Sequence, residues 1–456
     1  MTDQDNTQTV LFPGLFSKPV VATFDQAQGS SDGGAMLLKG ADEQLHLTER
    51  LAACLKDRRQ AGKVDHSLLD LLRQRVYGIA CGYADCNDAA RLADDPLQKL
   101  LLGRDPLEGD RLGSQPSLSR FENAVSRQEL LRLGEALADG VIAHHTARLK
   151  GKARWITVDL DPTDDPTHGQ QQLSFFNGYY DSWCYLPMVG TMRFNHEAEQ
   201  YLWTIALRPG NAAPAEGAIP LLSRILRRLR EAFPRATLRV RLDAGFATPE
   251  VFEFLEAAGV EYVVAMAGNT RLLKRARRAL ALARLKSCLS GKTEAVYTEA
   301  RYRAGTWRRP RRVIIKAEIV RDGVHEAKDN PRFVITNLRY RPETVYRHYR
   351  QRGQMENHIK ELHHGVEMDR TSCTSFWANQ FRVLLTAAAY VLMQQLRHCA
   401  EGTELARAQV STLRERLLKL GVWVKRSVRR IVLHLPAHYP WFPCWKRIAA
   451  ALGATS

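Results

Sequence analysis

The chain has 456 residues, of which 45% are hydrophobic and 25% charged, so it can bury a sizeable core in two or three domains. Lys and Arg number 66 against 49 Asp and Glu, and the net charge of +17 indicates a polyanionic partner such as nucleic acid. The longest apolar run, Val383 to Met393, is too short to cross a bilayer, which excludes a membrane-spanning protein. The N-terminus lacks a signal-peptide pattern, and the scattered cysteines fit thiols in a reducing cytoplasm.

Residues 1–150 predict an all-α N-terminal domain. Asp65 is a plausible N-cap for a helix whose apolar residues recur at helical spacing. A later helix begins near Pro116 or Ser117 and carries Arg120 in its first turns, where the side chain can read base edges. This segment either binds DNA as a helix-turn-helix or forms a plain helical bundle.

Residues 151–267 and 342–400 predict an α/β core. The run RWITVDLD alternates, so Asp159 and Asp161 share one face of a half-buried strand. A hairpin of two strands, a helix, a strand ending on Asp243, a second helix and a further strand follow. Ligands of α/β sheets usually bind at strand ends, which is where these carboxylates are expected.

Between the two parts of the core, residues 268–341 predict a basic, β-rich insertion with one helix and three strand-like stretches. The cations that crowd around Trp307 are Arg301, Arg303, Arg308, Arg309, Arg311, Arg312 and Lys316. Such density of one sign of charge favours a phosphate-contacting module over an ordinary solvated face.

A single helix is predicted from Pro342 to Gly365, with the proline in its first turn and the glycine just past its last. One polar stripe of this helix consists of Tyr349, Arg352, Glu356, Lys360 and His363. A neighbouring apolar stripe, expected to be buried, consists of Met355, Ile359, Leu362 and Val366. Gly353 costs about 1 kcal/mol relative to Ala inside a helix, which either a close ligand or tight packing would explain.

A long, mostly buried helix is expected over residues 374–399. The C-terminal region, residues 401–456, contains one more helix from Ser411 and a strand from Val428. The pattern leaves open whether this region packs on the core or dimerises.

Three acidic positions stand on separate elements of the predicted sheet: Asp161 or Asp159 on the first strand, Asp243 at the end of a later strand, and Glu356 on the last core helix. Three carboxylates so arranged can hold two divalent cations, which activate a water or hydroxyl and stabilise the leaving oxygen of a phosphodiester. Spacing alone is not specific for such a site, because a chain of this length has many acidic triples.

The segment from Tyr349 to Lys360, with LDPTDDPTHG and RLDAGF before it, resembles the DDE transposases of bacterial insertion sequences that carry a Tyr-Arg-Glu-Lys signature. More narrowly, the chain is similar to the insertion-sequence thirteen-eighty family. The signature spacing fits at Tyr349, Arg352 and Glu356, and the family's first catalytic Asp stands two residues before a Thr, which favours Asp161 over Asp159.

The resemblance implies an RNase H-like core that binds two Mg²⁺ or Mn²⁺ ions through Asp161, Asp243 and Glu356. It implies a bacterial, nucleoid-associated transposase that binds terminal inverted repeats and target DNA, acts as a homodimer in its synaptic complex, and cuts and joins strands, with hairpin ends as a further suggestion. The alternatives are an RNase H-like nuclease without strand transfer and a domesticated protein that only binds DNA.

The chain departs from the signature at one position. The expected Lys falls on His363, and Lys360 lies nearly a turn earlier on the same stripe. Either side chain could reach a phosphate, although a neutral His would do so as a hydrogen-bond partner. The resemblance also suggests that Trp307 stacks on a base, the alternative being a core tryptophan.

Overall fold

The computed structural model describes residues 9–321 and 326–455. Its central element is a nine-stranded sheet in the order β12-β13-β15-β11-β10-β4-β8-β9, with β14 paired to β13. These strands are β4 (Trp155–Pro162), β8 (Met188–Phe194), β9 (Tyr201–Ala206), β10 (Thr237–Leu242), β11 (Glu261–Met266), β12 (Glu294–Tyr302), β13 (Arg311–Val320), β14 (Lys328–Asp329) and β15 (Arg332–Thr336).

The core half of the sheet has the element order predicted from the sequence: β4, the β8–β9 hairpin, α8 (Ala218–Ala232), β10, α9 (Pro249–Ala257) and β11. β10 runs parallel to β4 and β11, whereas β8 is antiparallel to β4. Arg241 of β10 pairs in register with Asp159 of β4, so the carboxyl ends of these two strands lie together. This edge of the sheet carries the acidic positions predicted for catalysis.

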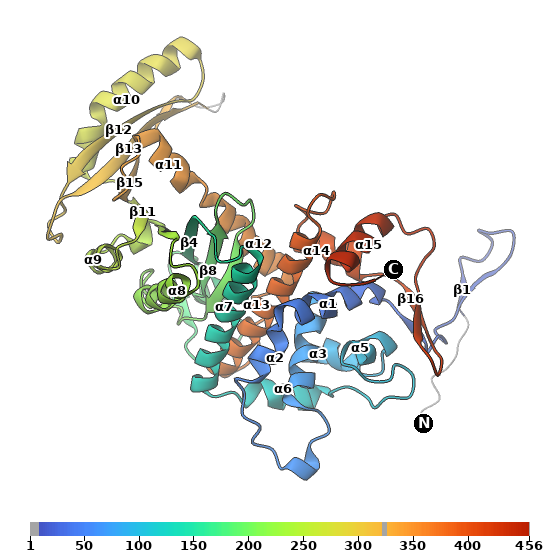
Figure 1. Ribbon diagram of the computed structural model, residues 1–456. Helices are drawn as coiled ribbons and strands as arrows, with labels where there is room; N and C mark the ends of the chain where they lie inside the picture. Colours follow the sequence, from blue (N-terminus) through green and yellow to red (C-terminus); the bar gives the residue numbers. More distant parts are fainter. Residues whose placement is uncertain (1–8, 322–325, 456) are drawn as a thin grey trace.

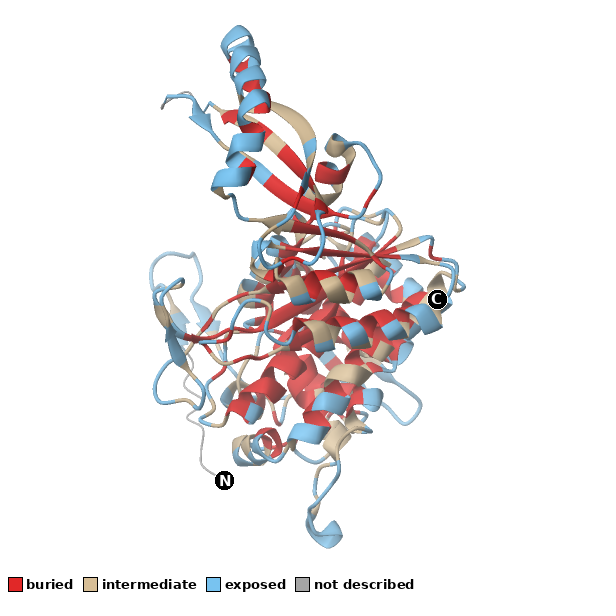
Figure 2. Ribbon diagram, turned by 90° about the vertical axis from the view of Figure 1, so that its left-hand side faces the viewer, coloured by how far each residue is buried: buried red, intermediate tan, exposed pale blue. Residues whose placement is uncertain are grey.

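The N-terminal helices are joined to the core and do not form a lobe of their own. α13 (Phe376–Cys399) is buried almost throughout, and α1 (Met36–Leu45), α3 (Leu68–Ala80) and α7 (Arg127–Arg148) pack against it. One hydrophobic core therefore runs from Ala35 to Ala449. In Figure 1 these helices gather around α13 beneath the sheet, and Figure 2 shows the buried residues concentrated there. A helix that is buried on every side needs partners all around it.

The rest of the N-terminal segment differs from the prediction in detail. It contains the short strands β1 (Thr9–Leu11), β2 (Val20–Ala22) and β3 (Gly29–Ser30), so it is not entirely helical. The cap of α3 is Ser67, whose side chain accepts from the backbone N–H of Asp70, and not Asp65. The remaining helices are α2 (Leu47–Ala52), α4 (Cys86–Arg91), α5 (Pro96–Leu101) and α6 (Gln115–Asn123).

The segment predicted as an insertion extends the core sheet. β15 pairs antiparallel with β11, and β13 and β12 continue outward from it. α10 (Thr270–Ser290) packs on β12 and β13, and in Figure 1 this half of the sheet projects away from the helical body. The insertion is thus rigidly continuous with the strands that carry the acidic residues.

The predicted helix from Pro342 to Gly365 is wrong in one respect, because the structure divides it. α11 (Pro342–Arg350) and α12 (Gly353–Val366) meet at Gln351 and Arg352. A Cβ on Gly353 would meet nothing within 4 Å, so tight packing does not explain this glycine. Gly365 lies inside α12, and Glu367, at φ 51°, ends the helix in its place. The predicted apolar stripe is confirmed: Met355, Leu362 and Val366 are buried and Ile359 is partly buried.

Arginines from the sheet hold this junction. Arg241 donates to the backbone oxygen of His348 at 2.9 Å, and Arg193 of β8 donates to Oε1 of Gln351 at 2.6 Å. Glycine is a poor helix former, so these contacts readily bend the chain beside Gly353.

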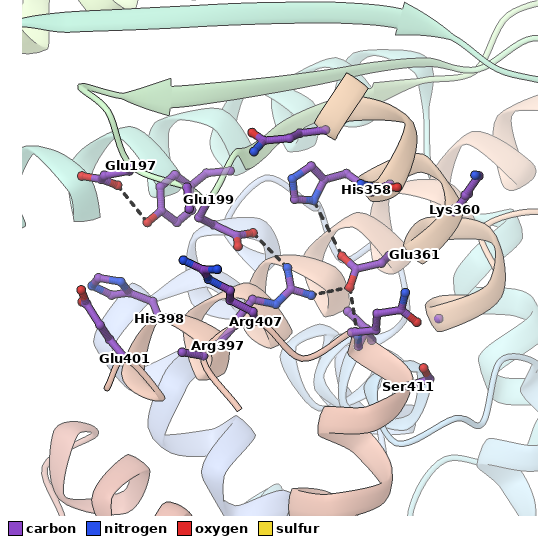
Figure 3. A pocket seen from close by; sticks show the side chains of 18 of the residues that line it. Glu197, Glu199, His358, Lys360, Glu361, Arg397, His398, Glu401, Arg407 and Ser411 are labelled. Atoms are coloured by element: carbon purple, nitrogen blue, oxygen red, sulfur yellow. Dashed lines mark hydrogen bonds and ion pairs between the residues drawn. The ribbon is translucent and has the colours of Figure 1, made fainter. Parts of the chain in front are cut away.

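On its opposite side α12 is anchored by Arg397 of α13. The guanidinium lies 2.6 Å from Glu361 of α12 and 3.0 Å from Glu199, as Figure 3 shows. Tyr390 also donates to Glu361, at 2.7 Å. Burial opposes ionisation of Glu361, but His358, at 3.7 Å, together with Arg397 and Tyr390 lowers its pKa to about 2.

The C-terminal region packs on the N-terminal segment. It contains α14 (Val410–Leu413), a π-helical turn (Arg414–Leu418), β16 (Val422–Arg426), β17 (Ile431–His434) and α15 (Phe442–Ala451). β16 pairs with β3, and α15 packs on α1 and α13. No helix within the described ranges combines the length and apolarity needed to span a bilayer.

We predict that ionisation of Glu361 makes the free energy of unfolding depend on pH. The pKa of Glu361 in the folded protein lies below the ordinary 4.5, so the ionised side chain stabilises the fold fully above about pH 4.5. This stabilisation is lost as the pH falls toward 2. The loss amounts to about 3 kcal/mol. Urea unfolding from about pH 5 downward should therefore show a shallower decline for Glu361→Gln than for the wild type. The exposed Glu415→Gln is the control and should follow the wild type; parallel curves for all three proteins would contradict the assignment.

Candidate functional site

Asp161 and Asp243 lie at the carboxyl ends of two adjacent parallel strands. Asp161 is on β4, and Asp243 follows β10 and caps a short helical turn by accepting from the N–H of Gly245 at 2.9 Å. Burial raises the pKa of Asp161 to about 6, the nearby Arg352 opposes this rise, and the charge of Asp243 adds to it. Two carboxylates that repel each other in a largely buried place suit a bound cation, and their oxygen donors suit Mg²⁺ or Mn²⁺.

Asp159, the alternative to Asp161, is occupied by another partner. Both of its oxygens accept from Arg241, at 2.7 and 2.6 Å, and both side chains are buried. A bidentate, buried pair of this kind joins the two strands. Asp159 therefore has a structural part in this arrangement, and Asp161 is the strand carboxylate next to Asp243.

Arg352 and Tyr349, expected on DNA phosphates, face the acidic pair. Arg352 is 9% exposed and its guanidinium nitrogen lies 2.5 Å from Asp161, so it neutralises a carboxylate here and does not face solvent. Tyr349, at the end of α11, is partly buried beside Tyr346, and burial raises the pKa of its hydroxyl, with Asp243 and Asp161 among the nearby charges. Both signature residues thus lie at the site, although the expected DNA contact of Arg352 would require it to leave Asp161.

Glu356 is exposed on the first turn of α12, one helical turn beyond Arg352 and on the same side. Within residues 9–321 and 326–455, no three His, Cys, Asp or Glu side chains lie in an arrangement that could hold a metal ion. The structure brings Asp161 and Asp243 together and leaves Glu356 outside that cluster.

His363 and Lys360 point in different directions from α12. Nε2 of His363 lies 3.3 Å from the hydroxyl of Thr163, two residues after Asp161, and Nδ1 lies 3.6 Å from Asp369. Lys360 is instead exposed and borders a cleft of about 1180 Å³ that residues of α12 and α13 line (Figure 3). The histidine, and not the lysine, is the stripe residue beside the acidic strand end.

Trp307 and two arginines near it are structural. Trp307 is 3% exposed and packs edge-on against Phe252 and Tyr302, with the Arg311 guanidinium 5.0 Å from its ring. The structure does not support the expected stacking on a base, because no ring face is free. Arg311 pairs with Glu256 at 2.8 Å, and Arg312 pairs with Glu299 and the oxygen of Tyr340.

The other cations predicted to contact DNA face solvent. Arg308 and Arg309 are exposed, although they pair with Glu253 and Glu256 at 3.3 and 2.6 Å. Arg120 is exposed on α6 and its guanidinium lies 3.3 Å from Ser117. α10 is the element whose cations most clearly face outward, because it has no acidic residue and buries mainly alanines.

A cluster of aromatic residues near the acidic pair was not predicted from the sequence. Six aromatic residues lie between Phe175 and Tyr185, directly downstream of Asp161, and several are exposed. The high density of aromatic residues in this segment is the sequence feature from which an exposed aromatic surface could have been predicted. Exposed aromatic groups next to a charged site commonly mark an interaction surface.

Stability should distinguish the two carboxylates of β4. Asp159→Asn leaves Arg241 buried without its partner, and we predict a loss of about 3–5 kcal/mol in the free energy of unfolding. Asp161→Asn should cost less, because burial and the like charge of Asp243 already disfavour the charge that it removes, and Arg352 keeps the charge of Asp243 nearby. Chemical denaturation of both variants at neutral pH measures the difference. Equal losses would show that Asp159 has no special structural part.

Comparison with known proteins identifies a family over nearly the whole chain. A family model described as "Transposase DDE domain group 1" matches residues 12–456. No curated protein matches. Among solved structures, a cryo-EM structure of a piggyBac transposase synaptic complex with hairpin DNA matches with 10% sequence identity and a TM-score of 0.43, covering 85% of this chain and 79% of that chain. On the family match, this chain belongs to the DDE transposases, domain group 1.

Proposed function

We propose that this DNA transposase binds terminal inverted repeats and carries out metal-dependent cleavage and strand transfer at the Asp161–Asp243 pair. The observation that carries the proposal is the position of these two carboxylates at neighbouring strand ends in a member of the DDE family. We also propose the narrower insertion-sequence thirteen-eighty group, on the signature residues Tyr349, Arg352 and Glu356.

In this proposal Asp161 and Asp243 hold a divalent ion, and Glu356 is the third acidic ligand. When bound, the ion supplies positive charge to phosphate oxygens and lowers the pKa of a water or hydroxyl nucleophile. Support comes from the donor chemistry: the two aspartates provide only oxygen ligands, and burial of Asp161 near a like charge favours a cation. Glu356 lies on the same side of α12 as Arg352, which contacts Asp161.

The chain's own groups have distinct parts in this proposal. Arg352 offsets the charge of Asp161 and keeps the start of α12 against β4. His363 lies beside Thr163, where an N–H can donate to a phosphate oxygen. The exposed cations of α10 supply the sequence-independent attraction to the DNA backbone. A homodimer would bring two DNA ends together.

Replacing Asp243 should abolish the chemistry. We predict that Asp243→Asn lowers Mg²⁺-dependent cleavage of a duplex carrying the gene's own flanking DNA at least about 100-fold, because a carboxylate ligand is worth several kcal/mol. Exposed Asp110→Asn is the control and should cleave like the wild type. Equal cutting by wild type and Asp243→Asn would refute the catalytic assignment. Hydrolysis without joined products would favour a nuclease, and specific DNA binding without metal affinity would favour a domesticated binder.

His363 and Lys360 should differ in their effect on rate. We predict that His363→Ala slows cleavage about 10- to 100-fold, because a hydrogen bond to a charged group contributes about 1.5–3 kcal/mol. His363→Lys should retain most of the activity, since an ammonium group can also donate to a phosphate. Lys360→Ala should have little effect, since Lys360 is exposed at the cleft and His363 is the residue beside Thr163. A larger loss for Lys360→Ala than for His363→Ala would reverse the assignment.

A further inference from the structure

A small sheet built directly downstream of Asp161 exposes a group of aromatic rings. Its strands are β5 (Asp165–Pro166), β6 (Phe175–Asn177) and β7 (Ser182–Tyr185), in the order β5-β7-β6. We call Phe176, Tyr179 and Trp183 the aromatic ledge; these side chains are 53%, 88% and 60% exposed. Exposing three large rings to water in so short a segment is unfavourable in free energy, and a patch of this kind usually marks a binding site.

The rings of the ledge are arranged as a surface. Phe176 and Trp183 are register partners on β6 and β7, so they stand on one side of the small sheet, with ring centroids 6.4 Å apart. Tyr179 lies in the turn that joins these strands, with its ring 4.9 Å from that of Tyr180. The edge-to-face contacts leave ring faces open to solvent.

The base of the ledge is fixed by polar contacts. Asp165 is buried and both of its oxygens accept from the hydroxyl of Thr371, at 3.0 Å. The Tyr185 hydroxyl donates to the oxygen of Gln172 at 2.8 Å, and Asn177 donates to the oxygen of Gly210 at 2.9 Å. A surface held in this way loses little conformational entropy when a ligand binds.

The ledge is close to the acidic pair. The N–H of Thr167 donates to the oxygen of Trp183 at 2.9 Å, and Thr167 stands six positions after Asp161, a span of at most about 20 Å. Tyr180 feels the charge of Asp161, which adds to the rise in its pKa caused mainly by burial and Asp164. At about 3.4 Å per nucleotide, the ledge lies within roughly six nucleotides of a phosphate bound at the site.

The chemistry of the ledge favours an unpaired base over a phosphate or a duplex. Asp164 and Asp181 flank it, and their charges disfavour contact with the DNA backbone. Aromatic rings instead stack on base faces, which are covered in a duplex and free in a single strand. Because the ledge lies near the acidic pair, a DNA strand with a phosphate bound at Asp161 and Asp243 can place its unpaired bases on the ledge.

We propose that Phe176, Tyr179 and Trp183 form a stacking platform for unpaired bases of the DNA strand that is bound at Asp161 and Asp243. This inference rests on the proposed function and adds a binding surface to it.

The test uses the full chain and a duplex with a short unpaired 3′ tail that carries 2-aminopurine at each tail position in turn. Wild type should quench the fluorescence at one or more positions and bind the tailed duplex more tightly than a blunt duplex. Trp183→Ala should abolish the quenching and weaken tailed binding about 10-fold, while blunt binding stays unchanged. Trp183→Phe should keep most of the preference for the tail.

Trp423→Ala is the matched control, since Trp423 is 56% exposed on β16, which belongs to a different sheet. Quenching by Trp183→Ala equal to that of wild type would overturn the platform, as would a change in oligomeric state alone, which would assign the ledge to contact between two copies. Failure of wild type to cleave with Mg²⁺ would count against the proposed function. Retained cleavage without any preference for the tail would count against the ledge alone.

Discussion

The buried ion pair between Asp159 and Arg241 sets the geometry of the site. It links β4 to β10 by two hydrogen bonds, and a third from Arg241 ties both strands to the end of α11. Because the two residues are register partners, the residues two positions further along each chain lie at the same level of the sheet. Those residues are Asp161 and Asp243. The buried Asp159–Arg241 ion pair therefore aligns Asp161 with Asp243, two carboxylates whose charges repel each other.

Contacts of arginine side chains also explain why the helix predicted from Pro342 to Gly365 is divided. Arginines on β8 and β10 hold the chain at Gln351 and His348, and Arg352 turns back to Asp161 on β4. In an unbroken helix the oxygen of His348 would accept from the N–H of Arg352; here Arg241 donates to that oxygen, and the N–H of Arg352 donates to the oxygen of Tyr349 at 2.9 Å. The Glu361–Arg397 pair then fixes the far side of α12. The helix that carries Glu356 and His363 is therefore constrained from both sides before DNA binds.

Local patterns in the sequence predicted much of this fold. The order of core strands and helices and the buried stripe of α12 follow from periodicity, which is a property of neighbouring residues. The break at Gln351 was not predictable, because it depends on arginines that are distant in sequence. The choice between Asp159 and Asp161 depends likewise on the position of Arg241. The helices predicted as a separate N-terminal domain pack on α13, and contacts across more than two hundred residues leave no periodic signal.

The net charge of +17 is best understood by separating structural cations from available ones. Arg241, Arg311, Arg352 and Arg397 are buried or nearly so and neutralise carboxylates, so they add little to the field that DNA would meet. The exposed cations of α10 have no acidic neighbour on their own helix, which makes that helix the stronger attraction for a phosphate backbone. Trp307 sits among the buried group, and the aromatic ledge stands apart beside Asp161. Charge that attracts the backbone and rings that can stack on bases are therefore supplied by different parts of the molecule: the cations by α10, and the rings by the small sheet that follows Asp161 in the chain.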